Sequence, residues 1–415
     1  MTTRYGTPAS RAFALTMLLV VYTFNFLDRQ VLGILAVPIK TELGLTDFQL
    51  GMLGGLAFAI LYSTLALPFA WIADRTKRTW VISFSLAIWS GFTALCGMAT
   101  SFGQLFLCRV AVGVGEAGGV APSYALISDI YPPHQRARAL SVYSLGIPLG
   151  AALGALFGGY IAATVNWRTA FIAVGLAGLL FAPVFTLFVR EPERPHAPPG
   201  TGLGLDIFRM LAAKPSFWLL AFGAASASML GYGMAFWLPS LMRRSFGMDL
   251  IGVSRFYGLL LLGGGIPGVL LGGWLGDRAG RRGKPGYARV PGIAFLAAAP
   301  LFALGMLSHS STMALLLFLV PQGLAYMWLG PVLTAVQHLV PAGRRATASA
   351  SFLLINNLIG LGLGSMTIGA MSDALAPRFG PEALKAALLG ALTFYLVAGV
   401  LMLIAAPRLA RDWVD

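Results

Sequence analysis

The stretch GGWLGDRAGRR, residues 272–282, guides the interpretation of the whole chain, because a similar stretch, WIADRTKR, occurs at 71–78. In both stretches an apolar run ends in an Asp-Arg pair followed by further basic residues. The matching acids, Asp74 and Asp277, lie about half a chain apart in a sequence of 415 residues. A repeat of this length predicts two halves with the same order of helices.

The composition indicates which solvent surrounds these helices. Hydrophobic residues make up 57% of the chain and charged residues 11%, whereas soluble domains carry about 25% charged residues. Because charged side chains are costly in hydrocarbon, this deficit predicts an integral membrane protein. The two cysteines, Cys96 and Cys108, lie in apolar surroundings and imply no disulfide framework.

Runs of about 20 apolar residues are long enough to cross a hydrocarbon layer about 30 Å thick, and the chain contains twelve of them. They are expected near residues 11–38, 47–73, 79–99, 102–129, 138–162, 167–189, 215–241, 249–275, 289–308, 311–337, 346–373 and 383–406. We therefore predict an all-α integral membrane fold of two pseudo-symmetric six-helix bundles. The bundles span residues 1–189 and 215–415, and a polar, Pro-rich cytoplasmic linker at 190–214 joins them.

The Lys and Arg residues predict the orientation of the chain in the membrane. If the N-terminus is cytoplasmic, twenty basic residues fall on the cytoplasmic side and seven on the other. We therefore expect both termini to be cytoplasmic, in the inner membrane of a bacterium, with an N-terminal tail and no cleaved signal peptide. The formal net charge of +14 then reflects topology, so nucleic acid is not an expected partner.

Five motifs, in matching order, resemble the major facilitator superfamily. They are GGWLGDRAGRR at 272–282, RVAVGVGEAGG at 109–119, GIPLGAALGALFGGY at 146–160, NWRTAF at 166–171 and REPERP at 190–195. Within that superfamily, FNFLDRQVLGIL, LGLTDFQLGMLGGLAF and GVGEAGGVAPSYALISDIYP are most similar to the Spinster group. The resemblance implies the major facilitator fold and secondary transport. The Spinster group is associated with the export of lysolipids and sphingolipid phosphates, and organic-anion/proton symporters share the acidic pattern of the first helix.

The charged residues inside predicted spans include Asp28 in the first, and Arg109 and Glu116 in the fourth. At about 1.5 Å per residue, the depth of Asp28 lies between those of the other two. Burial, like-charge repulsion and a nearby guanidinium act in opposite directions, which can let one carboxyl group exchange its proton near neutral pH. We predict that Asp28 and Glu116 carry protons and that Arg109 is a switch or an anion anchor.

Two more arginines belong to the predicted switch or substrate group. Arg29 follows Asp28 about 100° further around the helix, so we expect it to meet a carbonyl group or another helix. Arg255, in the eighth span, is expected to meet a headgroup at the outer mouth or to snorkel towards water. The alternative for the buried charges is a permanent salt bridge that holds the first and fourth spans together.

Aromatic, apolar and amide side chains within the spans are candidates for a substrate cavity. These candidates are Tyr22, Asn25, Met229, Tyr232, Phe236, Trp237, Tyr326, Trp328, Asn356 and Asn357. For each of them, ordinary helix packing is the alternative.

The charged loops predict a cytoplasmic gate, in which Asp74 and Asp277 accept charge-assisted hydrogen bonds from neighbouring helix ends. The gate candidates are Asp74, Arg75, Arg78, Asp129, Arg136, Arg138, Asp277, Arg278, Arg281, Arg282, Arg344 and Arg345. The alternative is that these charges only set the topology.

No motif supports an enzyme, a metal site or a cofactor. The four histidines lack metal-ligand spacing, and no GxxxxGK[ST] run is present. We predict a proton-coupled secondary active transporter working by alternating access on an amphiphilic anionic or zwitterionic lipid, such as a lysophospholipid or a sphingosine-1-phosphate-like molecule. The alternatives are a proton-coupled transporter of small organic anions and a passive lipid facilitator or scramblase. The expected partners are membrane lipids, the substrate and protons, and the expected state is a monomer.

Overall fold

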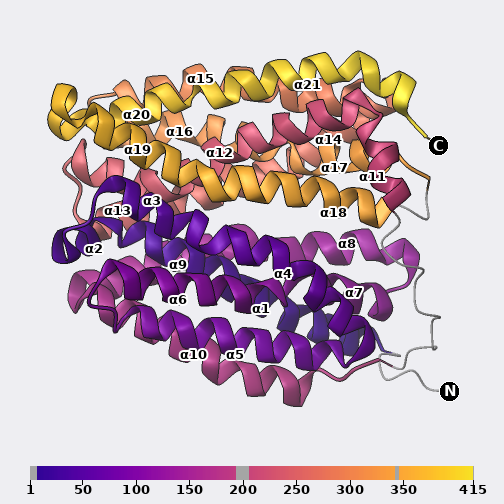
Figure 1. The fold of residues 1–415 in the computed structure, drawn as a ribbon, viewed down its shortest axis with the longest axis horizontal. Coiled ribbons are helices and arrows are strands. Elements are labelled where there is room, and N and C mark those ends of the chain that lie inside the picture. Colours follow the sequence, from indigo (N-terminus) through magenta and orange to yellow (C-terminus); the bar gives the residue numbers. More distant parts are fainter. Residues whose placement is uncertain (1–6, 193–204, 342–344, 415) are drawn as a thin grey trace. The chain divides into compact units, whose positions relative to one another are not determined.

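The computed structural model describes residues 7–192, 205–341 and 345–414, and this part of the chain contains helices and no strands. Figure 1 shows the helices in chain order. They are α1 (Pro8–Ile34), α2 (Ala36–Leu43), α3 (Asp47–Gly54), α4 (Leu56–Arg75), α5 (Arg78–Cys96), α6 (Phe102–Ala117), α7 (Val120–Ile130), α8 (Pro133–Ser144), α9 (Gly146–Thr164), α10 (Trp167–Phe188), α11 (Leu205–Ala212), α12 (Pro215–Arg244), α13 (Leu250–Leu260), η1 (Leu261–Gly265), α14 (Ile266–Arg282), α15 (Gly286–Leu307), α16 (Ser311–Tyr326), α17 (Leu329–Gln337), α18 (Arg345–Asn356), η3 (Asn357–Leu361), α19 (Gly362–Phe379), η4 (Gly380–Glu382), α20 (Ala383–Ala391) and α21 (Thr393–Asp412).

Eleven helical segments in the described residues are long and apolar enough to cross a membrane. The last of them, Ala348–Asp412, has 65 residues, which is enough for two crossings. Gly380 interrupts this segment with a φ of 53°, a backbone conformation that favours glycine. The segment therefore accounts for two spans, and the predicted all-α fold with twelve membrane helices is confirmed.

Several spans predicted as single helices are broken in the structure. The first ends at Ile34 and resumes as α2, and the fourth is interrupted at Gly118 and Gly119 between α6 and α7. The eighth contains a π-helical turn, η1, in a run of three glycines. Such breaks free backbone groups locally and occur frequently at functional sites.

The chain divides into two compact units. Unit 1 contains residues 1–45, 52–200 and 249–258, and unit 2 contains 46–51, 201–248 and 259–415. Each unit thus includes a short segment that the sequence analysis assigns to the other bundle. The bundle boundaries at 189 and 215 stay a prediction, and helix α11 lies inside the predicted linker.

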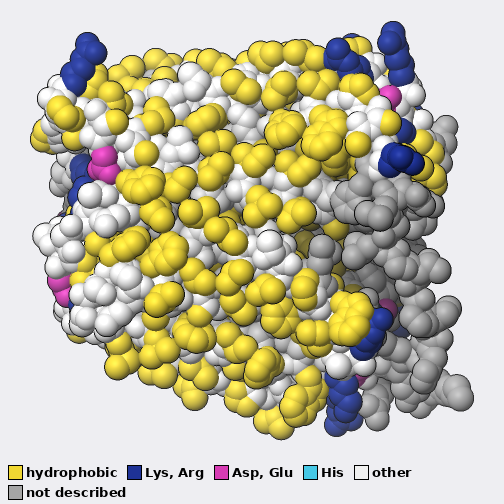
Figure 2. Space-filling view, in the orientation of Figure 1, with side chains coloured by type: hydrophobic (Ala, Val, Ile, Leu, Met, Phe, Trp, Pro, Cys, Tyr) yellow, Lys and Arg dark blue, Asp and Glu magenta, His cyan; other side chains and the backbone are white. Residues whose placement is uncertain are grey.

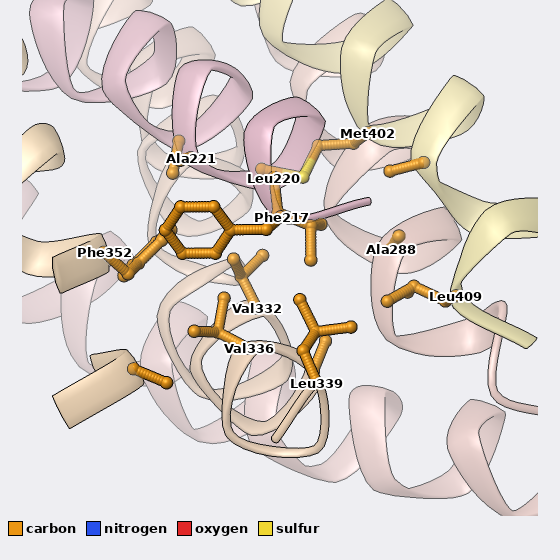
Figure 3. Packing of buried hydrophobic residues seen from close by; sticks show 14 of the residues in the cluster. Phe217, Leu220, Ala221, Ala288, Val332, Val336, Leu339, Phe352, Met402 and Leu409 are labelled. Carbon is orange, nitrogen blue, oxygen red and sulfur yellow. The ribbon is translucent and has the colours of Figure 1, made fainter. Parts of the chain in front are cut away.

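A hydrophobic cluster at one end of unit 2 fixes several helices together (Figure 3). Phe217 and Leu220 from α12 pack with Val336 from α17, Phe352 from α18 and Met402 from α21, and each is at most 2% exposed. In a membrane protein such close packing stabilises the fold mainly through van der Waals contacts between the helices.

The outside of the helices is also apolar. Figure 2 shows hydrophobic side chains over much of one face, with Lys and Arg gathered near its edges. Large apolar side chains that are more than half exposed include Trp71, Trp80, Phe84, Leu180 and Leu187. This exterior is suited to lipid rather than water.

Candidate functional site

Glycines on α6 bring three helices of unit 1 unusually close together. A Cβ atom at Gly113 would lie 2.6 Å from the carbonyl oxygen of Phe58 on α4. A Cβ atom at Gly115 would lie 2.6 Å from the backbone nitrogen of Trp89 on α5. Any larger residue would force the helices apart, so the spaced glycines explain how α6 fits between α4 and α5.

The charged residues of α6 point into this packed region. Arg109 and Glu116 are seven residues apart, which is about two helical turns, so they share one side of α6. Arg109 is 1% exposed and Glu116 is fully buried, and Asp28 on α1 is 1% exposed. The structure therefore places all three charges inside unit 1.

Asp28 has a partner on each of two other helices. One carboxylate oxygen, Oδ2, accepts a hydrogen bond from the NH1 group of Arg109 at 3.1 Å. The other, Oδ1, lies 2.6 Å from the hydroxyl oxygen of Thr93 on α5. These two contacts join α1 to α5 and α6.

Glu116 pairs with Arg29 rather than with Arg109. Its Oε2 atom accepts hydrogen bonds from Nε of Arg29 at 2.8 Å and from Nδ2 of Asn25 at 2.7 Å. NH2 of Arg29 lies 2.7 Å from the same oxygen. Of the two contacts expected for Arg29, a carbonyl group or another helix, the structure has the second. The adjacent residues Asp28 and Arg29 of α1 thus pair with two different residues of α6, because their side chains diverge around the helix.

Aromatic rings surround the Arg29 guanidinium. Its central carbon lies 4.5 Å from the ring centre of Phe58, 4.7 Å from that of Tyr62 and 5.0 Å from that of Phe26. Cations are attracted to aromatic faces at such distances. The three rings therefore help to hold the Arg29 guanidinium in place.

The buried cluster, defined as Asp28, Arg29, Arg109 and Glu116 with their neutral partners Asn25 and Thr93, is formally neutral when both acids are ionised. Within the described residues, its buried polar atoms without a hydrogen-bond partner include Oε1 of Glu116, Oδ1 of Asn25 and Nε of Arg109. Buried polar atoms without partners are rare and commonly mark functional sites. No group of His, Cys, Asp and Glu suited to a metal ion occurs in the described part of the chain.

The remaining cavity candidates are distributed over both units. In unit 1, Tyr22 stacks on Tyr143 with ring centres 4.3 Å apart. In unit 2, Trp237 is fully buried and donates to the carbonyl oxygen of Ser365 at 2.8 Å, and Asn356 accepts from Ser228 at 2.8 Å. The other candidates are partly or fully buried: Met229, Tyr232, Phe236, Tyr326, Trp328 and Asn357. Arg255 is exposed and lies outside the buried cluster.

The predicted gate is only partly visible. Arg78 forms an ion pair with Asp129, so Asp129 partners a cation of its own unit. Arg75 lies over the ring of Trp71, and Arg278 lies over that of Trp274. Arg281 and Arg282 are exposed. Arg344 and the side chains of Asp74, Arg136, Arg138, Asp277 and Arg345 lie outside the described residues.

Two features of the structure were missed in the sequence analysis. Thr93 touches Asp28, and nothing in the sequence distinguishes it from the other hydroxyl residues of the same span, which are Thr79, Ser83, Ser85 and Ser90. Asp47 accepts two hydrogen bonds from Arg244, at 2.6 and 2.8 Å, and one from Ser372 at 2.7 Å. In the sequence, Asp47 begins a predicted span and lies within LGLTDFQLGMLGGLAF, but neither pattern predicts a partner almost 200 residues away.

Comparisons with known proteins agree with this architecture. A family model described as the Major Facilitator Superfamily matches residues 18–365. An MFS-type efflux pump of Mycolicibacterium smegmatis is 32% identical over 99% of this chain and 96% of its own length. The protein spinster of Drosophila melanogaster is 26% identical over 88% of this chain, which matches 62% of that longer protein.

Solved structures give the same result. A bacterial homologue of the human lysosomal transporter Spinster, in an inward-facing and unoccupied conformation, superposes with a TM-score of 0.87 and 31% identity. The superposition covers 99% of this chain and 100% of that chain. A peptide transporter of 17% identity superposes with a TM-score of 0.73 over 99% of this chain and 97% of its own, a likeness of fold alone.

Proposed function

Because the chain belongs to the major facilitator superfamily and is Spinster-like, which makes it a transporter and not an enzyme, we propose that it couples transport to protons by alternating access. The observation that carries this proposal is the buried cluster: Asp28, Arg109 and Glu116 are at most 1% exposed within membrane spans, and the side chain of Arg29 beside them is 14% exposed. Ionisable groups in such positions are costly and mark ion or substrate pathways.

The proposed coupling rests on the charge balance of the buried cluster. With both acids ionised the four charges cancel, and the two ion pairs hold α1 against α6. A proton bound to Glu116 removes the negative partner of Arg29 and leaves one uncompensated positive charge. An anionic substrate group can restore the balance, because a buried charge without a counter-ion is strongly unfavourable. Proton binding would thus prepare the site for an anion.

For the substrate, we propose an amphiphilic lipid with an anionic or zwitterionic headgroup, such as a lysophospholipid or a sphingosine-1-phosphate-like molecule. The support is the likeness to Spinster proteins, the arginines of the cluster and the apolar and aromatic side chains of unit 2. The name of the Mycolicibacterium relative, an efflux pump, favours export. Small organic anions remain the second candidate, since the two arginines would suit a carboxylate equally well.

Several further features belong to the same proposal. The protein resides in a bacterial inner membrane with both termini cytoplasmic, acts as a monomer and rocks its two bundles about a central site. The charged loops, including Asp74 and Asp277, stabilise the state that is closed to the cytoplasm.

The test is flux in proteoliposomes with an imposed pH gradient. We expect lysolipid transport to depend on the gradient in the wild type, and Asp28→Asn and Glu116→Gln each to abolish this dependence. Glu382→Gln is the matched control, because the ion pair of Glu382 among the described residues is a surface pair with Lys385, at 3.1 Å. Undiminished gradient-driven transport in both cluster variants would refute the coupling role. If flux in the wild type does not depend on the pH gradient, a passive facilitator or scramblase is supported instead. If only small organic acids are transported, the lipid substrate is refuted.

A further inference from the structure

Each acid of the buried cluster has two kinds of partner. Arg109 and Arg29 can only donate hydrogen bonds, so neither can accept the hydrogen of a protonated carboxyl group. Thr93 and Asn25 carry groups that both donate and accept. Both acids thus have one partner that only donates and one that can also accept. For Asp28 these are Arg109 and Thr93. For Glu116 they are Arg29 and Asn25.

Thr93 lies between two acceptors. Its hydroxyl oxygen is 2.6 Å from Oδ1 of Asp28 and 2.8 Å from the backbone carbonyl oxygen of Trp89. A hydroxyl group has one hydrogen, so it makes one strong donation at a time. When Asp28 is ionised, the hydrogen points to Oδ1. When Asp28 is protonated, the carboxyl hydrogen points to the hydroxyl oxygen, and the Thr93 hydrogen turns to the Trp89 carbonyl group.

Asn25 can make the corresponding exchange at Glu116. Its Nδ2 donates to Oε2 of Glu116 at 2.7 Å, while its own Oδ1 is buried without a partner in the described residues. A half-turn of the amide would present Oδ1 to Glu116 in place of Nδ2. The acceptor that a protonated Glu116 requires is therefore already in the site and is unused in the present arrangement.

We infer that Thr93 and Asn25 are positioning residues that keep Asp28 and Glu116 hydrogen-bonded in both protonation states, by reversing their donor and acceptor roles as the proton arrives and leaves. This inference rests on the proposed function, because it assigns a purpose to groups around the proton carriers. A proton then displaces only the donor-only arginines, while the carboxyl groups keep their places. The other charged or titratable side chains around the acids are Arg29 on α1, Tyr62 on α4, Cys96 on α5 and Arg109 on α6.

The simpler alternative is that Thr93 only bonds its own helix. Hydroxyl groups in helices frequently donate to the carbonyl group four residues earlier, and Thr64 on α4 does so at 2.8 Å from Ile60. Thr93 makes this bond too, but its contact with Asp28 is shorter and fully buried. Thr64 therefore provides a matched control that has the backbone bond and no acid.

The first experiment measures the acid directly. In the infrared spectrum of the reconstituted protein, the carbonyl band of protonated Asp28 is identified as the band lost in Asp28→Asn. We expect Thr93→Val, which keeps the shape and removes the hydroxyl group, to shift this band to higher wavenumber. Thr93→Ser and Thr64→Val should leave it in place. An unshifted band in Thr93→Val would overturn the inference for Thr93, whatever the transport result.

The second experiment compares gradient-driven transport with substrate exchange at equal pH on both sides. We expect Thr93→Val and Asn25→Leu to lower gradient-driven transport at least about tenfold, which corresponds to about 1.4 kcal/mol, and to lower exchange by a smaller factor. Thr93→Ser should restore the wild-type pH profile. Equal impairment of Thr93→Ser and Thr93→Val would indicate packing and overturn the inference.

The two proposals fail in different ways. If wild-type transport ignores the pH gradient, the proposed coupling fails. If the wild type responds and Thr93→Val and Asn25→Leu respond equally well, only the present inference fails. Should Thr93→Val not fold, as judged by gel filtration in detergent, Thr93→Ala replaces it with the same expected results.

Discussion

Glu42, near the end of α2, provides a pH-sensitive contact outside the membrane spans. Oε2 of Glu42 accepts from the indole nitrogen of Trp167 at 2.5 Å, and Oε1 accepts from NH2 of Arg168 at 2.7 Å. The bond from Trp167 and the bonds and charge of Arg168 together lower the pKa of Glu42 below its usual value of 4.5. These bonds favour the ionised form, so they stabilise the fold only while Glu42 is charged.

The sign of the resulting pH dependence follows from this lowered pKa. The contribution of Glu42 is complete above pH 4.5 and is lost as the pH falls through the lower pKa of the folded protein. Since the pair is partly exposed, we expect Glu42→Gln to cost at most about 1 kcal/mol at neutral pH. Thermal unfolding in detergent should show the difference between variant and wild type shrinking below pH 4. A constant difference from pH 7 to pH 3 would contradict this.

The pairing of residues 28 and 29 shows what can be read from a sequence at this scale. Two adjacent charges in an apolar run, together with Arg109 and Glu116, were enough to predict a buried charged region. The choice of partner depends on side-chain length and on the direction of each residue around its helix. Counting residues along two helices gives the depth of each residue but not its rotation about the helix axis. The count therefore could not predict that Arg29 pairs with Glu116.

At the scale of one helix, the small residues of α6 determine where its charges lie. The contact at Gly113 is made with the backbone of Phe58, whose ring also lies 4.5 Å from the Arg29 guanidinium. A side chain at Gly113 would therefore displace α4 and the ring together. The glycine pattern was visible in the sequence, but its neighbours on α4 and α5 were not, because they come from distant parts of the chain.

We expect Gly113→Ala to destabilise the protein by about 1–3 kcal/mol, the typical cost of overpacking, and to reduce transport. The matched control is Gly103→Ala on the same helix, where an added Cβ meets nothing within 4 Å. Because Ala is a better helix former than Gly, this control should be neutral or stabilising by up to about 1 kcal/mol. Unfolding temperatures of the two purified variants test the prediction, and equal temperatures would contradict it.

At the scale of the whole molecule, periodicity and charge placement predicted the twelve spans and their order. The reason is physical: each span must satisfy its own backbone in hydrocarbon and must be about 20 residues long. The same reasoning placed a single boundary between the halves near residues 190–214. It did not predict that Thr46–Gly51 belongs to unit 2, because that assignment depends on contacts between residues far apart in the sequence.

Polar contacts within unit 2 hold the segment Thr46–Gly51. Asp47 is 4% exposed at its side chain and forms the two hydrogen bonds to Arg244. The carboxylate of Asp373 accepts from the backbone nitrogens of Asp47 and Phe48, at 3.1 and 2.7 Å. Ser365 donates to the carbonyl oxygen of Gly51 at 2.8 Å. Among these contacts the ion pair alone joins two opposite charges, so its loss should have the largest effect.

Asp47→Asn leaves Arg244 beside a neutral amide in a mostly buried position. Breaking one partner of a buried ion pair typically costs about 3–5 kcal/mol, so we expect a clear fall in the unfolding temperature of the detergent-solubilised protein. Asp249→Asn is the control, because Asp249 also precedes a helix, and among the described residues its carboxylate accepts from the backbone nitrogen of Gly252, at 2.9 Å, and from no cation. Since Asn is as good a helix cap as Asp, this control should cost little.

Equal losses in the two variants would show that Asp47 acts as a cap alone. A larger loss in Asp47→Asn, reduced when Arg244→Gln is added, would show that the ion pair keeps the segment in unit 2.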